Sequence, residues 1–478
     1  MRRLSHVTPS LPGWTLERDG DFAGITADSR AVGPGMIFAA LPGTRVDGRM
    51  FIADAVARGA AAVLAPTGTP WPAGTPPRPL LADPNPRRRL AEIAVSLAGA
   101  LPRRIVAITG TNGKTSTVDF LRQIITAAGK PAASLGTLGL IAPGFPVGGS
   151  LTTPDPVTLA ATLARLKAAG IDHVALEASS HGLDQYRLHG LHPAAGAFTN
   201  LTRDHLDYHG DLANYRTAKL RLFAEILPRG APSLAMADLD PETLAALRAI
   251  RPDLATVGEG GSTLDLRGIT PLPAGQVLVV QAAGRRHEIE LSLPGRFQAD
   301  NALLAAGLAR ALGFEDALDR LAGLAPVRGR LELAASLANG AAAYVDYAHT
   351  PDALDRLLAA LRPHATGRLI LVFGAGGDRD RGKRPLMGAV AARRADVAIV
   401  TDDNPRSEVP AAIRAEIRTA CPDALDIGDR RAAIEAGLAM LRPGDVLAVA
   451  GKGHEQGQIV GEAVLPFDDA AIIRALAA

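Results

Sequence analysis

A glycine-rich segment at residues 110–115, with the sequence GTNGKT, contains the residue types that hold a nucleotide phosphate. Its glycines let backbone N–H groups turn inward around phosphate oxygens, and a helix that starts there adds positive potential. Lys114 would reach the β- and γ-phosphates, and the Thr115 hydroxyl would complete the shell of a Mg²⁺ ion. The full Walker spacing is absent, because Ile108 stands where its first glycine belongs. We therefore predict a nucleotide site, with ATP as the nucleotide.

A carboxylate and a histidine further along the chain predict a metal site. Glu177 ends the apolar run HVALE, and a carboxylate at the end of a buried strand must be paired or bind a cation. His205 lies in the run DHLDYH. Mg²⁺ prefers oxygen ligands and keeps waters, so few protein groups would suffice, whereas no spacing such as HExxH supports zinc. His181 and His209 fit a capping or hydrogen-bonded role at least as well as a metal.

The chain uses lysine sparingly, since only six of its 51 basic residues are lysines. In a sequence so biased toward arginine, lysine is expected mainly where a compact ammonium or a deprotonated amine is required. Four of the six lie in the motifs described here, namely Lys114, Lys219, Lys383 and Lys452. Lys130 and Lys167 fit exposed positions around a helix.

Short apolar strands that alternate with helical stretches must position these residues. The run at residues 104–108 leads into the glycine segment and then into an amphipathic stretch at 116–129, and a second series begins after residue 330. Such alternation is typical of parallel α/β sheets. Ligands of these sheets bind beyond the carboxyl ends of the strands, where polar residues recur in this sequence. These residues are Glu177, Asn200, Asp346 and the segments 374–380, 402–406 and 451–455.

Length and pattern together predict three domains. At about 150 residues per domain, 478 residues give roughly three. We predict a smaller N-terminal α/β domain at 1–98, a central P-loop ATPase-like domain with a parallel sheet at 99–326, and a C-terminal Rossmann-like α/β domain at 327–478. The segment at 66–86 holds eight prolines, and this density predicts a loop late in the first domain.

The composition excludes several classes of protein. With 51 Lys and Arg against 49 Asp and Glu, the chain lacks the charge of a general nucleic-acid binder. The single Cys421 excludes an internal disulfide framework and a multi-cysteine zinc site. No apolar run approaches the roughly 18 residues of a membrane span, and polar residues follow Arg2 and Arg3 where a secretory core would lie. We expect a soluble, cytoplasmic protein without membrane insertion.

Eleven motifs, in this order, resemble those of the Mur ligase family. They are TADSR (26–30), GTNGKT (110–115), LTTPD (151–155), EASSHGLDQYR (177–187), TNLTRDHLDYHG (199–210), YRTAKLRLF (215–223), VRGRLE (327–332), VDYAHTPDAL (345–354), FGAGGDRDRGKRPLMG (373–388), DDNPR (402–406) and GKGHE (451–455). The resemblance implies that the first domain holds the UDP of a nucleotide precursor, the second binds ATP, and the third binds an incoming amino acid.

The same resemblance implies residues for each substrate. The UDP portion would contact Ser29, Gly43, Thr44 and Arg45. The muramoyl peptide would contact Thr152, Thr153, Ser179, Gln185 and Arg187. ATP would contact Gly110, Thr111, Asn112, Gly113, Lys114, Thr115, Ser116, Asn301, Arg330 and Asp346.

Lys219 matches the lysine that is carbamylated in this family. A deprotonated amine adds CO₂ and becomes a carboxylate-like group that can help to hold a second Mg²⁺. The resemblance thus implies that the metal is held by Thr115, Glu177, His205 and carbamylated Lys219. It implies that the catalytic residues are Lys114, Glu177, His205 and Lys219. An ordinary lysine on an amphipathic helix is the alternative for Lys219.

Amino-acid choice is expected in the third domain. Arg406 can form a two-pronged, charge-assisted bond with the distal carboxylate that diaminopimelate has and lysine lacks. Asp403, Asn404, Pro405 and Arg406 match the signature of family members that add diaminopimelate, and Arg379, Gly451 and Glu455 match further contacts to that amino acid.

The implied reaction uses ATP and Mg²⁺ to join meso-diaminopimelate to the D-glutamate of UDP-N-acetylmuramoyl-L-alanyl-D-glutamate through an acyl phosphate, and a monomer is expected. Three alternatives remain open. The same ligase with L-lysine as acceptor is disfavoured by DNPR, and a folylpolyglutamate synthetase-like ligase is disfavoured by HTPDAL and DDNPR. A nucleotide-binding regulatory or scaffold protein is disfavoured by the joint presence of Lys114, Glu177, His205 and Lys219.

Overall fold

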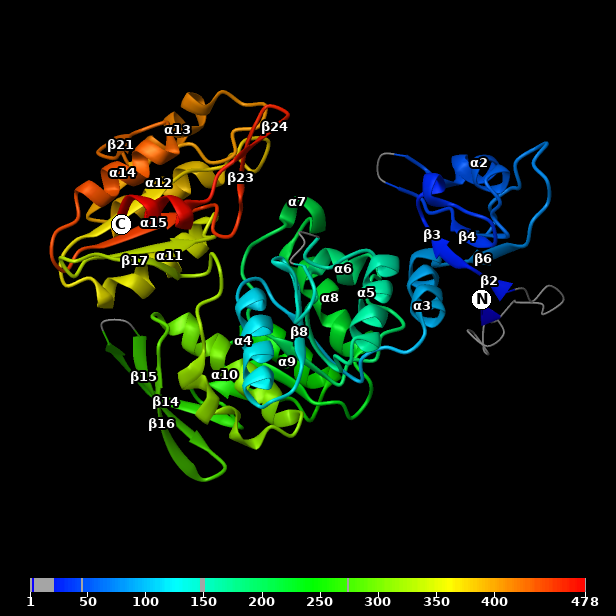
Figure 1. Cartoon of the computed structure of the whole chain (residues 1–478), viewed down its shortest axis with the longest axis horizontal. Coiled ribbons are helices and arrows are strands. Elements are labelled where there is room, and N and C mark those ends of the chain that lie inside the picture. Colours follow the sequence, from blue (N-terminus) through cyan, green and yellow to red (C-terminus); the bar gives the residue numbers. More distant parts are fainter. Residues whose placement is uncertain (1, 4–20, 44–45, 147–150, 273–274, 478) are drawn as a thin grey trace.

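The computed structural model describes residues 2–3, 21–43, 46–146, 151–272 and 275–477. Within these ranges the chain forms three α/β bodies in sequence order (Figure 1). The N-terminal body, drawn in blue, lies on the far side of the central body from the C-terminal body, drawn in yellow to red (Figure 1). The predicted α/β class with three sheet-containing domains is confirmed, while the exact boundaries at residues 98/99 and 326/327 stay predictions.

The N-terminal body has a four-stranded parallel sheet in the order β3-β4-β5-β6. Its elements are β1 (Arg2–Arg3), β2 (Asp21–Phe22), β3 (Gly24–Thr26), β4 (Met36–Ala39), α2 (Ile52–Ala57), β5 (Ala62–Pro66), β6 (Leu80–Asp83) and α3 (Pro86–Ala98). Strand β6 corrects the prediction of a loop across residues 66–86. The prolines lie on either side of β6, which is an edge strand of the sheet, so none removes a ladder hydrogen bond within it.

The central body has a ten-stranded sheet in the order β16-β15-β14-β13-β12-β11-β7-β10-β8-β9. Its strands are β7 (Arg104–Thr109), β8 (Ala132–Gly136), β9 (Gly139–Ile141), β10 (His173–Glu177), β11 (Ala195–Phe198), β12 (Ser233–Met236), β13 (Ala255–Gly258), β14 (Leu264–Leu272), β15 (Gly275–Ala282) and β16 (Arg285–Leu291). Its helices are α4 (Lys114–Ala127), α5 (Pro156–Ala168), α6 (Ser180–Asp184), α7 (Leu206–His209), α8 (Leu212–Arg221), α9 (Pro241–Ile250) and α10 (Arg296–Ala311). The seven neighbouring strands β14-β13-β12-β11-β7-β10-β8 run parallel, whereas β9, β15 and β16 pair antiparallel at the two ends of the sheet.

Strand β7 is apolar on both faces because helices cover both sides of the sheet. Val106 and Ile108 pack in one buried cluster with residues of α4 and α10, and Ile105 and Ala107 pack in another with residues of α5. Parallel neighbours β10 and β11 flank β7. The glycine segment that follows β7 therefore emerges in the middle of the sheet, between the carboxyl ends of two other strands.

The C-terminal body has a six-stranded sheet in the order β17-β18-β22-β19-β20-β21, parallel except for β17, and a separate hairpin of β23 and β24. Its strands are β17 (Glu332–Ser336), β18 (Ala342–Asp346), β19 (Leu369–Phe373), β20 (Val397–Val400), β21 (Leu425–Asp426), β22 (Val446–Ala450), β23 (Gly457–Val460) and β24 (Ala463–Pro466). Its helices are α11 (Pro351–Leu361), α12 (Lys383–Arg394), α13 (Pro410–Arg418), α14 (Arg430–Ala439) and α15 (Asp469–Ala477).

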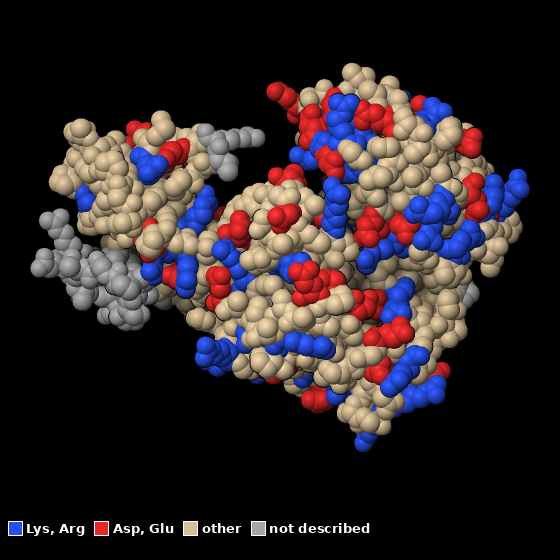
Figure 2. Space-filling view, turned by 180° about the vertical axis from the view of Figure 1, so that it is seen from behind, with Lys and Arg blue, Asp and Glu red and all other residues tan. Residues whose placement is uncertain are grey.

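Charge and hydropathy on the surface follow the composition. Figure 2 shows basic and acidic side chains interspersed over one face of the molecule. Across the described ranges, no helix combines the length and the apolar character needed to cross a membrane.

Candidate active site

The glycine segment forms a turn between β7 and α4 that requires glycine at two positions. Gly110 has a φ of +140° and Gly113 a φ of +85°. A Cβ on Gly110 would lie 1.8 Å from Oγ1 of Thr199, and a Cβ on Gly113 would lie 2.3 Å from Oδ1 of Asn301. The turn is therefore shaped against β11 and α10. Asn301, which the resemblance assigns to ATP, lies directly beside it.

Hydrogen bonds to the end of β11 fix the backbone of this turn. The Thr111 N–H donates to the Asn200 carbonyl oxygen (2.8 Å), and the Asn112 N–H donates to Oδ1 of Asn200 (3.0 Å). The Thr199 hydroxyl donates to the Asn112 carbonyl oxygen (2.6 Å). A loop held in this way keeps its shape before a phosphate binds, which lowers the entropy cost of binding.

Lys114 is the first residue of α4, and its side chain folds back over the turn. Its Nζ donates to the carbonyl oxygens of Gly110 (3.0 Å) and Thr111 (2.8 Å). Desolvation lowers the pKa of Lys114, and the carboxylates of Glu177 and Asp204 oppose that shift. The amine thus lies where a phosphate would meet the loop, within the electrostatic reach of two acidic groups.

The next residues of α4 connect the turn to the C-terminal body. Thr115 and Ser116 are buried in the first turn of the helix. Oγ1 of Thr115 accepts a hydrogen bond from Nη2 of Arg330 (3.3 Å), and the Arg330 guanidinium lies 4.6 Å from the ring centroid of Tyr347. Two residues that the sequence assigned to ATP are therefore in direct contact although 215 positions separate them.

Asp346 ends β18 and shapes the chain beside Arg330. Its Oδ2 accepts from the Leu331 N–H (2.6 Å), and its Oδ1 accepts from the Ala348 N–H (2.8 Å). Desolvation raises the pKa of Asp346, and the charge of Arg330 opposes that shift. The structure therefore brings Asp346 and Arg330 together beside the central body.

Glu177 ends β10 next to the turn, and it is buried with an exposed fraction of 2%. Its Oε1 accepts from the Thr137 N–H (2.8 Å), and its Oε2 accepts from the Thr137 hydroxyl (3.2 Å). The residue before Thr137 is Gly136, whose lack of a side chain leaves room for the carboxylate. The two hydrogen bonds satisfy part of the carboxylate and leave lone pairs that can bind a cation.

Gly136→Ala is expected to lower the activity of this site by about 10²-fold, because a shift of about 1 Å in a group near the reacting atoms has effects of this size. The new Cβ would lie 2.1 Å from Oε1 and 2.5 Å from Cδ of Glu177, so the carboxylate must move. Steady-state rates measure the effect, and a thermal melt checks the fold. Gly323→Ala is the control, since nothing lies within 4 Å of a Cβ there. Equal rates in both variants would contradict the prediction.

Lys219 lies on α8 and is buried, with an exposed fraction of 1%. Its Nζ donates to the Gly110 carbonyl oxygen (2.7 Å) and lies 4.3 Å from the ring centroid of Tyr215. Desolvation, with the positive charge of Lys114 as a second cause, lowers the pKa of Lys219 well below its usual value. A buried lysine beside another cation at a phosphate loop has no ordinary role on a helix surface. The structure thus disfavours the amphipathic-helix alternative.

His205 precedes α7 in a left-handed backbone conformation, with a φ of +53°, and 48% of its side chain is exposed. Its ring centroid lies 4.9 Å from that of His181, and its Nε2 lies 3.5 Å from Oδ2 of Asp204. Desolvation lowers the pKa of His205, and desolvation lowers the pKa of His181 to about 4. Both rings are therefore neutral near pH 7, which is the form that can bind a metal.

The donor set around the turn fits magnesium better than zinc. Within the parts of the chain that the structure describes, no group of three or more His, Cys, Asp or Glu side chains could hold a metal ion. Thr115 and Glu177 supply hard oxygen donors, and Mg²⁺ needs only one or two carboxylates when substrate phosphates and waters complete its shell. The residues present therefore fit Mg²⁺ that is held partly by a nucleotide.

The residues assigned to the muramoyl peptide lie together beside Glu177. The Thr153 hydroxyl donates to the Glu177 carbonyl oxygen (2.7 Å) and accepts from the Ser179 N–H (3.0 Å). Nη1 of Arg187 donates to the Thr153 carbonyl oxygen (2.5 Å), and its Nη2 donates to Oε1 of Gln185 (2.7 Å). Thr152 is within 3.1 Å of the Thr137 hydroxyl that also contacts Glu177. All five predicted residues thus surround one end of β10.

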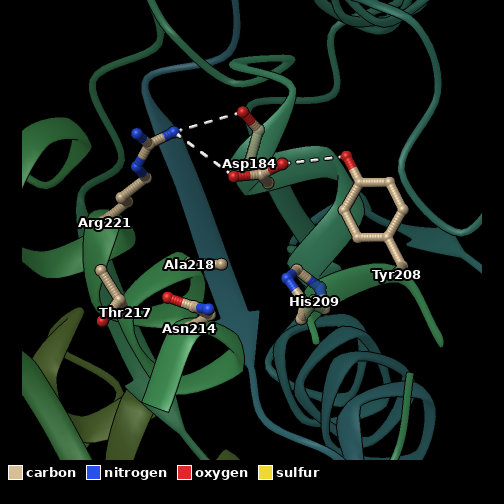
Figure 3. Close-up of a pocket in the computed structure, with 7 residues that line it drawn as sticks. All are labelled: Asp184, Tyr208, His209, Asn214, Thr217, Ala218 and Arg221. Atoms are coloured by element: carbon tan, nitrogen blue, oxygen red, sulfur yellow. Dashed lines mark hydrogen bonds and ion pairs between the residues drawn. The ribbon is translucent and has the colours of Figure 1, made fainter. Parts of the chain in front are cut away.

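A polar cavity of about 410 Å³ lies behind this group. It is lined by Asp184, Tyr208, His209, Asn214, Thr217, Ala218 and Arg221. Figure 3 shows Arg221 and Tyr208 reaching Asp184 from opposite sides, with Ala218, which is next to Lys219 in the chain, in the middle of the view. The Tyr208 hydroxyl donates to Oδ2 of Asp184 (2.9 Å), so α6 and α7 are tied together at this point.

Arg221 is a residue that the sequence reasoning missed. Tyr186 has a φ of +59°, which is uncommon for a bulky residue. The Arg221 guanidinium lies 4.4 Å from the Tyr186 ring centroid and donates to its hydroxyl (2.8 Å) and to the Asp184 carbonyl oxygen (3.2 Å). Arg221 therefore holds the turn that carries Gln185 and Arg187. Its position in the Lys219 motif was the available signal.

The residues assigned to UDP lie in the N-terminal body, away from the phosphate turn. Ser29 begins a short 3₁₀ turn, and Asp28 caps that turn by accepting from the Arg30 N–H (3.0 Å). A Cβ on Gly43 would lie 2.3 Å from the Val46 carbonyl oxygen, which requires glycine there. The predicted contacts Thr44 and Arg45 lie outside the described residues. This part of the predicted site is not brought together with the rest.

Several of the residues that the resemblance assigns to diaminopimelate lie together where β20 and β22 end. Nδ2 of Asn404 donates to Oε2 of Glu455 (2.9 Å), and Oδ1 of Asn404 accepts from Nζ of Lys452 (2.9 Å). Gly451 has a φ of +120°, and a Cβ there would lie 2.4 Å from Oδ2 of Asp403. Lys452 is fully buried, and desolvation lowers its pKa. The sequence singled out Lys452 because lysine is rare in this chain, but it assigned this lysine no role. Its hydrogen bond to Asn404 indicates that it holds that side chain in place.

Arg406 and Arg379 lie on two adjoining loops. Nη1 of Arg406 donates to the carbonyl oxygens of Gly377 (2.9 Å) and Asn404 (3.4 Å). Pro405 is buried, and its carbonyl oxygen would lie 1.9 Å from a Cβ on Gly377. Arg379 is exposed. The structure thus places the two predicted guanidinium groups on loops in direct contact with each other.

Three segments of the chain match described parts of one protein family. Residues 108–309 match the Mur ligase middle domain, residues 329–453 the Mur ligase glutamate ligase domain, and residues 21–94 the Mur ligase family catalytic domain. The chain is 54% identical over 463 residues to the UDP-N-acetylmuramoyl-L-alanyl-D-glutamate--2,6-diaminopimelate ligase of Caulobacter vibrioides. That match covers 95% of this chain and 95% of the relative. The protein of that name from Rhizobium meliloti is 52% identical over 477 residues, with 97% of each chain covered.

A solved structure agrees with these relatives. The structure of a UDP-N-acetylmuramoyl-L-alanyl-D-glutamate--2,6-diaminopimelate ligase is similar with a TM-score of 0.73 and 31% identity, and the match covers 99% of this chain and 98% of that one. Identity at this level over nearly the full length of both chains shows common descent. The chain therefore belongs to the Mur ligase family.

Proposed function

We propose that this protein is an ATP-dependent ligase that joins meso-diaminopimelate to the D-glutamate of UDP-N-acetylmuramoyl-L-alanyl-D-glutamate, with release of ADP and phosphate. The observation that carries the proposal is the pairing of the buried Lys219 amine with the phosphate turn at Gly110. The relatives at 54% and 52% identity bear the name of a ligase with these substrates. The groups assigned to all three substrates come from one chain, so a monomer suffices, and we propose that it acts in the cytoplasm.

The reaction has two steps. The D-glutamate γ-carboxylate attacks the ATP γ-phosphorus, the bond to the bridging oxygen breaks, and an acyl phosphate and ADP result. An amine of diaminopimelate then attacks the acyl carbon, phosphate leaves, and the amine loses a proton. Lys114 neutralises charge on the phosphates in the first step, where an anion approaches a polyanion. The turn from residue 110 to 115 orients the nucleotide through backbone N–H groups.

Magnesium would be held by Thr115, Glu177, His205 and a carbamate on Lys219. Bound there, Mg²⁺ supplies positive charge that stabilises the transferred phosphoryl group. The carbamate forms when the neutral amine of Lys219 adds CO₂ and releases a proton. Burial and the charge of Lys114 support this proposal, because both favour the neutral amine.

Amino-acid choice would rest on Arg406. Within the described residues its Nε and Nη2 have no hydrogen-bond partner, while Nη1 is held by Gly377 and Asn404. A carboxylate could therefore bind this guanidinium without displacing the contacts that position it. L-lysine lacks the distal carboxylate, and its bound form would leave the guanidinium unpaired.

The proposed function is tested by phosphate release from ATP and Mg²⁺ in the presence of UDP-N-acetylmuramoyl-L-alanyl-D-glutamate. Three reactions are compared, with meso-diaminopimelate, with L-lysine and without an amino acid. Release that depends on meso-diaminopimelate is expected. Release with L-lysine instead would keep the family and refute the assigned acceptor, and no release with either acceptor would refute the proposed reaction.

Arg406→Gln is expected to raise the KM for meso-diaminopimelate by about 10²-fold, because loss of a desolvated, charge-assisted pair costs at least about 2–3 kcal/mol. The KM values for ATP and for the UDP substrate should not change. Arg406→Lys, which keeps the charge and loses the planar fork, should fall between the wild type and the glutamine variant. A KM for meso-diaminopimelate that is unchanged in both variants would contradict the role of Arg406.

A further inference from the structure

Arg384 is a fully buried cation behind the acceptor loops, with an exposed fraction of 0%. It lies in the first turn of α12. Its Nη1 donates to Oε2 of Glu408 (2.9 Å) and to Oε2 of Glu416 (2.9 Å), and its Nη2 donates to Oε1 of Glu408 (2.8 Å). The pair with Glu408 is therefore two-pronged, while the pair with Glu416 uses one bond. A buried guanidinium needs such partners, since an unpaired buried charge is costly.

The two glutamates differ in what else they touch. Glu408 follows the DNPR run, and its Oε1 also accepts from the Asp378 N–H (2.6 Å) on the neighbouring loop. Nη2 of Arg384 reaches that loop as well, at the Gly376 carbonyl oxygen (3.3 Å). Glu416 lies further along, on α13, and its other ion pair is with Arg381.

These contacts tie together the two loops that carry the acceptor guanidinium groups. The loop at 374–380 carries Arg379, and the loop at 402–408 carries Arg406. The Asp378 carboxylate adds a further link, since its Oδ1 accepts from the Ser407 hydroxyl (2.6 Å). The two loops are therefore joined both by direct hydrogen bonds and through the buried Arg384–Glu408 pair.

Arg384 and Glu408 both remain charged near neutral pH. The hydrogen bond from Arg384 is the first cause that lowers the pKa of Glu408 to about 2. Arginine stays protonated in proteins. The pair is therefore ionised near neutral pH, and its two-pronged geometry fixes orientation as well as distance.

We propose that the Arg384–Glu408 pair is a positioning device for acceptor selection, which holds the loops of Arg379 and Arg406 at the spacing that matches the distal carboxylate of a diamino dicarboxylic acid. This inference rests on the proposed function. Neither residue is expected to touch the amino acid, because Arg384 is fully buried and the Glu408 carboxylate is bound by Arg384 and by the Asp378 N–H. Both act through Arg406 and Arg379.

Two variants with the same chemical change separate this role from plain stabilisation. Glu408→Gln and Glu416→Gln each remove one carboxylate from the same buried guanidinium. Glu408 also accepts a hydrogen bond from the backbone N–H of Asp378, whereas Glu416 reaches that loop only through the exposed side chain of Arg381 at its end. For Glu408→Gln, we expect the KM for meso-diaminopimelate to rise at least about tenfold and its preference over L-lysine to shrink. The KM for ATP should not change. For Glu416→Gln, the acceptor KM should stay within about twofold of the wild type.

Thermal melts accompany the kinetics, and Glu408→Asp, which keeps the charge with a shorter reach, is the second variant if Glu408→Gln does not fold. It should shift the acceptor KM in the same direction. Equal acceptor KM values in the Glu408 and Glu416 variants would overturn the inference and leave a structural ion pair. Failure of the wild type to release phosphate with meso-diaminopimelate would instead overturn the proposed function.

Discussion

Replacing Lys219 with arginine is expected to lower the rate of ADP release by about 10³-fold. The change would remove the proposed carbamate ligand of magnesium, and loss of a metal ligand from a phosphoryl-transfer site costs several kcal/mol of transition-state stabilisation. Arginine keeps a positive charge and a long side chain, but its guanidinium cannot add CO₂. Lys219→Gln should show a loss of the same size. Thermal melts of both variants report whether the fold persists.

The reason lies in the surroundings of the amine. Lys219 is buried, its Nζ donates to the Gly110 carbonyl oxygen, and Lys114 adds a second positive charge nearby. These conditions lower its pKa from the usual 10.5, so the neutral, CO₂-reactive amine forms at a lower pH than for a lysine in water. We therefore expect activity to rise with added bicarbonate in CO₂-depleted buffer, and this dependence to disappear in both variants.

Lys130→Arg is the matched control, since Lys130 is exposed on the loop after α4. It should retain the wild-type rate. An intact-mass measurement under native conditions should show the mass of one added CO₂ on the wild type and on Lys130→Arg, and not on Lys219→Arg. If Lys219→Arg kept more than about a tenth of the activity, the carbamate proposal would be wrong.

The alternation of apolar runs and helical stretches was sufficient to predict the α/β class. The run at 104–108 became β7 and the stretch at 116–129 became most of α4, because each local preference agrees with the packing around it. The error at β6 has a physical cause. Each proline disfavours helix and central strand only at its own position. The four residues of β6 contain no proline and lie at the edge of the sheet, so a high proline density around them does not exclude a strand.

The sequence singled out the residues that are proposed to contact a ligand more readily than the residues that hold them in place. Glu177 and Lys219 stand in motifs, and the structure buries both of them beside the phosphate turn. Arg221 and Arg384 also stand in motifs, but their partners lie in other segments of the chain, and arginine is too common in this chain to be a signal by type. Pairing between distant segments is a property of the tertiary structure that no local pattern reports.

For a similar reason, the distances between the domains could not be predicted from the sequence. Ser29 lies in one of the eleven motifs, as Thr153 does, yet it lies in a separate body from the phosphate turn (Figure 1). The contact of Arg330 with Thr115 shows that the C-terminal body already meets the central one at the nucleotide end. If the first body holds the UDP portion, as the assignment of Ser29 and Gly43 proposes, the substrate has to extend from that body to the phosphate turn.

Lys114→Met is expected to lower kcat by about 10³-fold, which is the usual size of the effect when a preorganised charged group is removed from a developing negative charge. Methionine keeps the apolar stem but cannot neutralise the phosphates. Because Lys114 is half-buried and donates only to loop carbonyls, the thermal midpoint without ATP should fall by a few degrees at most. Single-turnover rates of ADP formation measure the chemical step directly.

Lys114 also acts on Lys219, and the two effects can be separated. The charge of Lys114 lowers the pKa of Lys219, so Lys114→Met raises it and leaves less neutral amine at a given pH. Lys114→Arg keeps this charge but places a broad, planar group where a compact ammonium fits between loop and phosphate. If Lys114 works only by keeping Lys219 neutral, then arginine or added bicarbonate should restore most of the rate. If it neutralises the phosphates directly, as we expect, bicarbonate should leave the methionine variant slow, and arginine should restore only part of the activity.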